Sequence, residues 1–263
     1  MPVVQANGIH MYYEIHGQGE PLVMIMGLSA NVDWWDPVIV ERLSKRYQLL
    51  LFDNRGAGRT EKPQMTYTIA LMAQDTVELM TQVGIEKAHI LGVSMGGMIA
   101  QELALHYPER VNKLILACTN CGGTQSIVAP PDVIGLFTNR TGTPDEIKQR
   151  MFKVLFPDEY IANHADQLEQ LWLRAIRAPI PTDALLRQLE AIQTFSTYDR
   201  LDQIQAPTLV MTGDQDILVP PKNAEIIAGR IPGARLEIFE GGGHGFTGQF
   251  PDKFCQVVEE FLG

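Results

Sequence analysis

Apolar residues along the chain follow two different spacings. Short apolar runs occupy residues 22–26, 47–52, 88–91, 111–117 and 207–213, and each has the length of a buried strand. Residues 69–83 instead place apolar side chains at helical spacing, as an amphipathic helix packed on a sheet would. Buried strands that alternate with such helices are typical of a mostly parallel central sheet with helices on both faces. The pattern therefore predicts an α/β fold.

Other segments alternate apolar and polar residues, as half-buried strands do. Residues 9–15 follow residues 3–5 across Asn7-Gly8, which is a strong turn signal for a β-hairpin. Residues 236–239 show the same alternation close to the end of the chain. We therefore expect the chain to open with a hairpin and to add a last strand before residue 240.

The pattern changes between about residues 122 and 203. No convincing strand occurs there, and prolines separate the helical segments. Residues 143–146 (Thr-Pro-Asp-Glu) begin one helix with a capping residue, a proline in the first turn and acidic residues after it. We therefore predict a core formed by residues 1–121 and 204–263, interrupted by a helical insertion at 122–203.

A serine flanked by glycines follows the predicted strand at 88–91. The segment at 92–96, Gly-Val-Ser-Met-Gly, leads into a helix with apolar residues at Met98, Ile99 and Leu103. A turn this tight leaves no room for bulky neighbours, and it exposes the serine hydroxyl above the sheet. The helix behind it directs its first N–H groups toward any oxyanion that forms. Ser94 is therefore the candidate nucleophile, and the alternative is that it only caps the helix.

A candidate base and a candidate orienting acid follow two later strands. Asp216 comes after the apolar run at 207–213, and His244 comes after the segment at 236–239, within a glycine-rich stretch. Both positions lie just past the carboxyl ends of predicted strands, where ligand sites form in open parallel sheets. The order Ser94, Asp216, His244 is the chain order of the α/β-hydrolase triad.

These motifs resemble those of α/β-hydrolase fold proteins over nearly the whole chain. The similarity rests on residues 25–28 (Ile-Met-Gly-Leu), 52–58 (Phe-Asp-Asn-Arg-Gly-Ala-Gly), 92–97 and 213–216. The resemblance implies that the insertion forms a helical cap over the active site. It also implies an oxyanion hole made by the backbone N–H groups of Leu28 and Met95. Within the family pattern the second aspartate of the acid loop is the triad member, which favours Asp216 over Asp214.

The subfamily is indicated by the segment at 94–98 and the loop at 53–56. Both look most like small esterases, enol-lactonases and aclacinomycin methylesterases. One departure is Met26, because most relatives carry a histidine before this glycine and use it in a structural hydrogen bond. Since the oxyanion donor is a backbone group, Met26 weakens the assignment to a subfamily more than it weakens the prediction of catalysis.

Aromatic side chains are candidates for lining a substrate pocket. The candidates are Phe137, Phe152 and Trp172 in the insertion, and Trp34 and Trp35 after the oxyanion segment. Packing in the core is the alternative explanation for each of them. The other histidines, His164 among them, have no ligand spacing, and we expect them to be structural or solvated.

The predicted reaction is hydrolysis of carboxylic esters with small to medium acyl groups. Ser94 would attack the carbonyl, His244 would take its proton, and Asp216 would orient the imidazole. An enol-lactonase, a C–C bond hydrolase or a cofactor-free perhydrolase could use the same triad, and the sequence does not separate them. Outside catalysis, a ligand receptor built on this fold is the alternative.

Composition narrows the choice of partners. The chain has 263 residues and a formal charge of −10, and it lacks the basic clusters that nucleic acid or an anionic membrane requires. No signal peptide, membrane span, dinucleotide fingerprint or metal-ligand cluster is recognised. Cys118 and Cys121 have the spacing of redox and zinc sites but lack a second pair. We therefore expect a cytoplasmic enzyme without cofactor or metal that acts on a small-molecule ester or lactone, and we leave a homodimer open.

Overall fold

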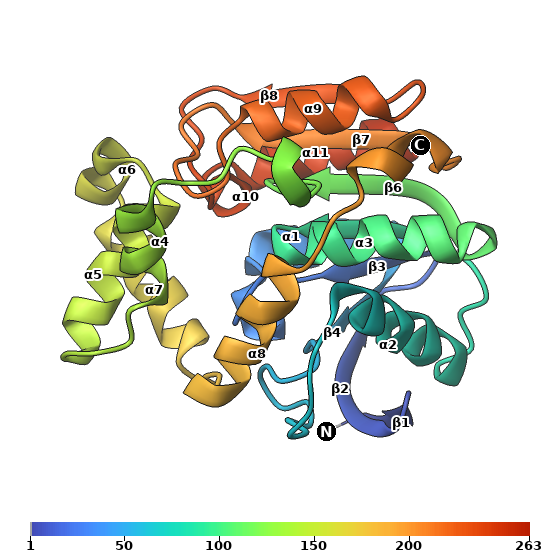
Figure 1. Cartoon of the computed structure of the whole chain (residues 1–263), viewed down its shortest axis with the longest axis horizontal. Helices are drawn as coiled ribbons and strands as arrows, with labels where there is room; N and C mark the ends of the chain where they lie inside the picture. The colour runs from blue at the N-terminus through green and yellow to red at the C-terminus, as the bar shows by residue number, and fades with distance from the viewer. Residues whose placement is uncertain (1) are drawn as a thin grey trace.

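The computed structural model describes residues 2–263 and contains an eight-stranded sheet (Figure 1). In spatial order the strands are β1 (Val3–Ala6), β2 (Ile9–His16), β4 (Tyr47–Phe52), β3 (Glu20–Ile25), β5 (Ala88–Val93), β6 (Val111–Ala117), β7 (Thr208–Gly213) and β8 (Arg235–Phe239). Strand β2 runs antiparallel to β1 and β4, and the remaining pairs are parallel. The predicted mostly parallel sheet and its N-terminal hairpin are confirmed.

Each central strand supplies side chains to two cores, one on each face of the sheet. In β3, Val23 and Ile25 belong to the first core, whereas Leu22 and Met24 belong to the second. All four side chains are fully buried. Burial on both faces explains why the sequence shows continuous apolar runs at these strands and not an alternation.

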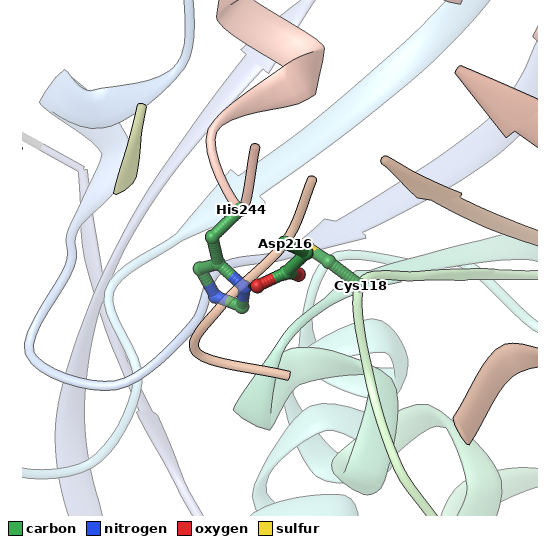
Figure 2. Close-up of side chains that lie close together, drawn as sticks. All are labelled: Cys118, Asp216 and His244. Atoms are coloured by element: carbon green, nitrogen blue, oxygen red, sulfur yellow. Dashed lines mark hydrogen bonds and ion pairs between the residues drawn. The ribbon is translucent and has the colours of Figure 1, made fainter. Parts of the chain in front are cut away.

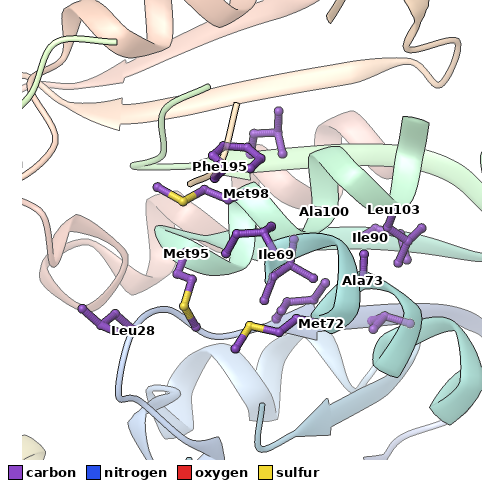
Figure 3. Close-up of a cluster of buried hydrophobic side chains, with 14 of the residues drawn as sticks. Leu28, Ile69, Met72, Ala73, Ile90, Met95, Met98, Ala100, Leu103 and Phe195 are labelled. Carbon is purple, nitrogen blue, oxygen red and sulfur yellow. The ribbon is translucent and has the colours of Figure 1, made fainter. Parts of the chain in front are cut away.

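Helices cover both faces of the sheet. The first core is covered by α2 (Ile69–Gln82), α3 (Met95–His106) and α9 (Lys222–Arg230). Figure 3 shows side chains of α2, α3 and β5 gathered in this core. The second core is covered by α1 (Pro37–Leu43) and α11 (Pro251–Leu262), which contact each other, and by the short α10 (Phe246–Gln249).

Five helices follow one another between β6 and β7. They are α4 (Pro131–Thr138), α5 (Pro144–Leu155), α6 (Asp158–Asn163), α7 (Ala165–Ala175) and α8 (Thr182–Gln193). Helices α4 to α7 form a group beside one end of the sheet (Figure 1). The predicted helix start at Thr143 is confirmed, because Thr143 and Glu146 form a reciprocal capping box. The two ends of the insertion are joined, since Thr197 N donates to Cys121 O over 2.8 Å. The limits 122 and 203 of a cap unit remain a prediction.

Short 3₁₀ helices connect the larger elements. They are η1 (Val32–Trp34), η2 (Pro108–Arg110), η3 (Gly123–Gln125) and η4 (Tyr198–Gln203). The first of them is capped by Asn31, whose Oδ1 accepts from Asp33 N. None of the helices in residues 2–263 combines the length and the apolar character that a membrane crossing requires.

Candidate active site

Ser94 occupies a strained turn between β5 and α3. Its backbone has φ 56° and ψ −119°, a conformation that residues other than glycine rarely adopt. A Cβ atom on Gly92 would lie 2.2 Å from the carbonyl oxygen of Gly96, and one on Gly96 would lie 2.1 Å from that of Ile25. The close approach of the backbone at this turn therefore requires glycine at both positions.

Hydrogen bonds hold the backbone of this turn and leave the hydroxyl free. Ser94 N donates to Ala117 O over 2.9 Å, and the Thr119 hydroxyl donates to Ser94 O over 2.8 Å. Ser94 Oγ makes no hydrogen bond to another residue of the described chain, His244 included. In free enzymes the hydrogen bond between nucleophile and base is often long and shortens only when substrate binds. The Ser94 hydroxyl therefore has no hydrogen-bond partner among the described residues.

His244 and Asp216 form a buried hydrogen-bonded pair. His244 Nδ1 lies 2.8 Å from Asp216 Oδ2, and the side chain of Asp216 is fully buried. The other carboxylate oxygen accepts from the backbone N–H groups of Leu218 and Val219, over 2.9 and 2.8 Å. Because a carboxylate only accepts hydrogen bonds, the imidazole carries its proton on Nδ1 and leaves Nε2 as an acceptor. This arrangement suits a general base.

Asp214 lies in a different environment. Its Oδ1 accepts from Gly241 N over 2.7 Å at an exposed position between the loops that follow β7 and β8. Asp214 therefore braces these loops and does not contact His244. Of the two aspartates, Asp216 is the one that is hydrogen-bonded to His244.

The segment after β3 runs beside the nucleophile. A Cβ atom on Gly27 would lie 3.0 Å from Ser94 Cβ, and Asn54 Nδ2 anchors the segment by donating to Met26 O over 2.8 Å. Among the described residues, neither Leu28 N nor Met95 N donates a hydrogen bond. Two free backbone donors near Ser94 can stabilise a developing oxyanion. The anchoring by Asn54 also shows how this loop is held with methionine at position 26.

The loop after β4 holds the segment after β3 in place. Asp53 is buried and accepts from Val32 N over 2.8 Å and from Arg59 N over 2.6 Å. Burial raises the pKa of Asp53, although these hydrogen bonds oppose the rise. Arg55 pairs with Asp75 inside the protein, with Nε 2.7 Å from Oδ2. These contacts are structural.

A cavity of about 400 Å³ joins these elements. Ser94 and His244 both line it, together with Gly27 and Leu28. Aromatic residues form much of the remaining wall, and those residues are Trp34, Trp35, Phe137, Phe156 and Tyr160. A largely apolar cavity with a few convergent polar groups is the usual form of a small-molecule site.

Two of the five aromatic pocket candidates do not line this cavity. Phe152 is buried one layer behind it, where its ring lies edge-on to Phe156 at a centroid distance of 6.0 Å. Trp172 lies on α7, which turns Leu168 and Leu171 to the cavity. Trp172 does not line the cavity; it is partly buried and packs against the first core. Of the five candidates, Trp34, Trp35 and Phe137 therefore lie in the cavity wall, whereas Phe152 and Trp172 do not.

The cavity wall also contains residues that the sequence reasoning missed. Phe156, Tyr160 and His164 are spaced four residues apart, and their rings stack at centroid distances of 5.3 and 3.9 Å. Tyr160 and His164 have the i, i+4 spacing of one helix, which was a signal available in the sequence, whereas Phe156 lies before α6 in extended backbone. His164, expected to be structural or solvated, lines the cavity, and so does Arg174.

Cys118 lies beside the His244–Asp216 pair (Figure 2). Within residues 2–263, these three side chains form a group whose potential ligand atoms lie within 4.8 Å of one another. Burial raises the pKa of the Cys118 thiol well above its usual value, and the nearby Asp216 raises it further. A protonated thiol is a poor metal ligand, and the hydrogen bond to Asp216 already occupies His244 Nδ1. Cys118 and Cys121 are both free and buried.

The sequence of the chain is similar to known proteins over most of its length. The family model described as alpha/beta hydrolase fold matches residues 20–247. A protein of Azorhizobium caulinodans named "Putative carbamate hydrolase RutD" is 30% identical over 263 residues, covering all of this chain and 98% of that protein.

Solved structures are similar over the same length. An N-acyl homoserine lactone degrading enzyme is 26% identical with a TM-score of 0.84, and the match covers 99% of this chain and 100% of that one. The enol-lactonase of Burkholderia xenovorans has the same fold, with a TM-score of 0.86, 24% identity and 99% of both chains covered. By its sheet, its strained serine turn and these matches, the chain belongs to the α/β-hydrolase fold family.

Proposed function

We propose that this hydrolase cleaves carboxylic esters with small to medium acyl groups through Ser94, His244 and Asp216. One observation carries the proposal. A serine in a strained turn and a histidine bonded to a buried carboxylate line the same cavity of about 400 Å³. A cavity of this size is suited to a small organic substrate.

The proposed reaction passes through an acyl-enzyme. Ser94 Oγ attacks the ester carbonyl while His244 Nε2 takes the hydroxyl proton, and the backbone N–H groups of Leu28 and Met95 stabilise the oxyanion. The tetrahedral intermediate collapses by breaking the bond to the leaving oxygen, which receives the proton from His244. Water then attacks the acyl group by the same route and releases the acid and Ser94.

We also propose that the insertion at 122–203 acts as a cap that selects the substrate. Its helices α4, α6 and α7 supply Phe137, Tyr160 and Leu171 to the cavity wall, opposite the residues of the core. Since the catalytic groups come from the core, changes in the cap would alter substrate choice more than chemistry.

A lactone or a carbamate is the second candidate substrate. Both contain a carbonyl that Ser94 could attack by the same steps. In a lactone the leaving oxygen stays tethered to the acyl group, and in a carbamate the carbonyl carbon carries a nitrogen. The relative named as a carbamate hydrolase favours a carbamate, and the 26% identical lactone-degrading enzyme favours a lactone. The geometry of the triad does not distinguish an ester from a lactone or a carbamate as the substrate.

A substrate panel tests the proposal. We expect the purified protein to hydrolyse p-nitrophenyl esters from acetate to octanoate, with the highest kcat/KM at a short or medium acyl chain. Lactones and O-aryl carbamates of similar size test the second candidate. Their hydrolysis is measured by the release of acid or of amine. A folded protein that turns over no ester would contradict the proposal, and a protein that binds these compounds without turnover would be a receptor.

The oxyanion hole gives a second expected result. Replacing Leu28 with alanine keeps the backbone N–H, so kcat should stay within about tenfold and the change should fall on KM. Replacing Leu28 with proline removes the N–H and should lower kcat at least ~100-fold. Circular dichroism and a melting curve must show that the proline variant folds. If a folded Leu28→Pro enzyme keeps near-normal kcat, the second donor lies elsewhere in the loop.

A further inference from the structure

One arginine in the cavity wall has no hydrogen-bond partner. Arg174 lies in the last turn of α7, and its side chain is only 17% exposed. Its Nε is buried without a partner, and no hydrogen bond joins its guanidinium to any other described residue. Because an arginine carries five N–H donors and remains charged, a shielded guanidinium without partners is costly.

The nearest carboxylate compensates this charge only in part. Asp36 Oδ2 lies 3.8 Å from Arg174 Nη2, which is beyond hydrogen-bonding distance. Asp36 is already used as the N-cap of α1, where its Oδ1 accepts from Val38 N over 2.9 Å. Desolvation by burial lowers the pKa of Arg174. The negative charges of Asp36 and Asp33 oppose this effect, and the positive charge of Arg177 adds to it. The guanidinium thus retains its donors for a further acceptor.

Polar groups accompany Arg174 along the same wall. Gln167 lies two helical turns before Arg174 on α7, and His164 immediately precedes that helix. His164 Nδ1 donates to Tyr160 O over 3.0 Å, so its Nε2 is left as a further polar atom. The cavity therefore has a polar side on α7 as well as the catalytic groups of the core.

We propose that Arg174 binds a carboxylate carried by the substrate, at a point separate from the ester or lactone bond that is cleaved. The proposal rests on the proposed function and names the substrate class as acids that carry a second, hydrolysable carbonyl group. A guanidinium binds a carboxylate through two parallel hydrogen bonds. Because Asp36 already offsets part of the charge, the site is suited to a single negative charge and less suited to a phosphate dianion.

Matched pairs of esters test this subsite. The monomethyl esters of succinic, glutaric and adipic acids carry a free carboxylate, and the dimethyl esters of the same acids do not. We expect the wild-type enzyme to favour at least one monoester over its diester by tenfold or more in kcat/KM. The Arg174→Met variant should raise KM for that monoester at least tenfold, with kcat and diester hydrolysis changed less than threefold.

Two further variants serve as controls. Arg174→Lys keeps the charge and should restore part of the loss. Arg177 is exposed and lies 3.6 Å from Asp33, so Arg177→Met should behave as wild type. Equal effects of Arg174→Met on monoester and diester would overturn the proposal, because they would show that Arg174 only holds α7 in place. The absence of any preference in the wild-type enzyme would overturn it as well.

Binding separates this proposal from the hydrolytic function. Calorimetry with monomethyl glutarate and Ser94→Ala protein does not depend on turnover, and the Arg174→Met change should weaken this binding at least tenfold. One outcome is that Arg174→Met loses carboxylate binding while wild type cleaves no ester. This outcome would support the carboxylate subsite and contradict the proposed hydrolytic function. If wild type cleaves esters and Arg174→Met keeps its affinity for the monoester, only the proposal of the carboxylate subsite is contradicted.

Discussion

Replacing Ser94 with alanine is expected to lower kcat for ester hydrolysis by about 10⁶, because the members of a triad act as a unit. The protein should stay folded, since Ser94 Oγ makes no hydrogen bond within the described chain and the turn is held by backbone groups. Steady-state kinetics on the best p-nitrophenyl ester, with a melting curve for each protein, measures both effects.

A neighbouring serine provides the control for this result. Ser29 follows Leu28 in the oxyanion segment but does not line the cavity. Ser29→Ala should therefore keep kcat within about tenfold, since it removes no proposed transition-state contact. Substantial activity in a folded Ser94→Ala protein, or a comparable loss in Ser29→Ala, would show that the nucleophile has been misassigned.

Asp216→Asn is expected to cost about 10⁴ in kcat, as loss of the orienting acid does in a related triad. Asparagine can still accept from Leu218 N and Val219 N, so the loop should keep its shape. Its amide would instead present a donor to His244 Nδ1, which favours the tautomer that cannot act as the base at Nε2. The measurement is kcat on an activated ester across the pH range in which wild type is stable.

Asp214→Asn is the matched control for this change. Asparagine Oδ1 can keep the hydrogen bond from Gly241 N, and Asp214 does not contact His244. We therefore expect a loss below about tenfold in kcat, with the main effect on the melting temperature. If Asp214→Asn proves far more damaging than Asp216→Asn, the orienting acid is the other aspartate.

The sheet could be predicted from the sequence because its strands are buried on both faces. Residues 22–25 of β3 and 49–52 of β4 are all apolar and buried, so the chain shows uninterrupted apolar runs where other strands would alternate. The turn at Ser94 was recognisable for a related reason. A Cβ on Gly92 or Gly96 would collide with backbone atoms, so the geometry dictates the residue type.

The cavity wall could be predicted only in part. Which side chains of a cap helix reach the cavity depends on how the helix packs on its neighbours, and Trp172 packs against the first core and not in the cavity wall. The role of Arg174 was hidden for a similar reason, since its lack of partners depends on where Asp36 lies in the folded chain. Local periodicity carries no information on such long-range distances.

Labelling with a serine-directed fluorophosphonate tests the central claim most directly. The probe should attach to Ser94 alone, because the nucleophile needs both the base at His244 and the exposed strained turn. Peptide mapping by mass spectrometry after brief exposure should find the adduct on the peptide containing Ser94 in wild type. Ser94→Ala protein should stay unlabelled, and Asp216→Asn should label far more slowly. An adduct at another serine, or equal labelling of wild type and Ser94→Ala, would contradict the assignment of Ser94 as the nucleophile.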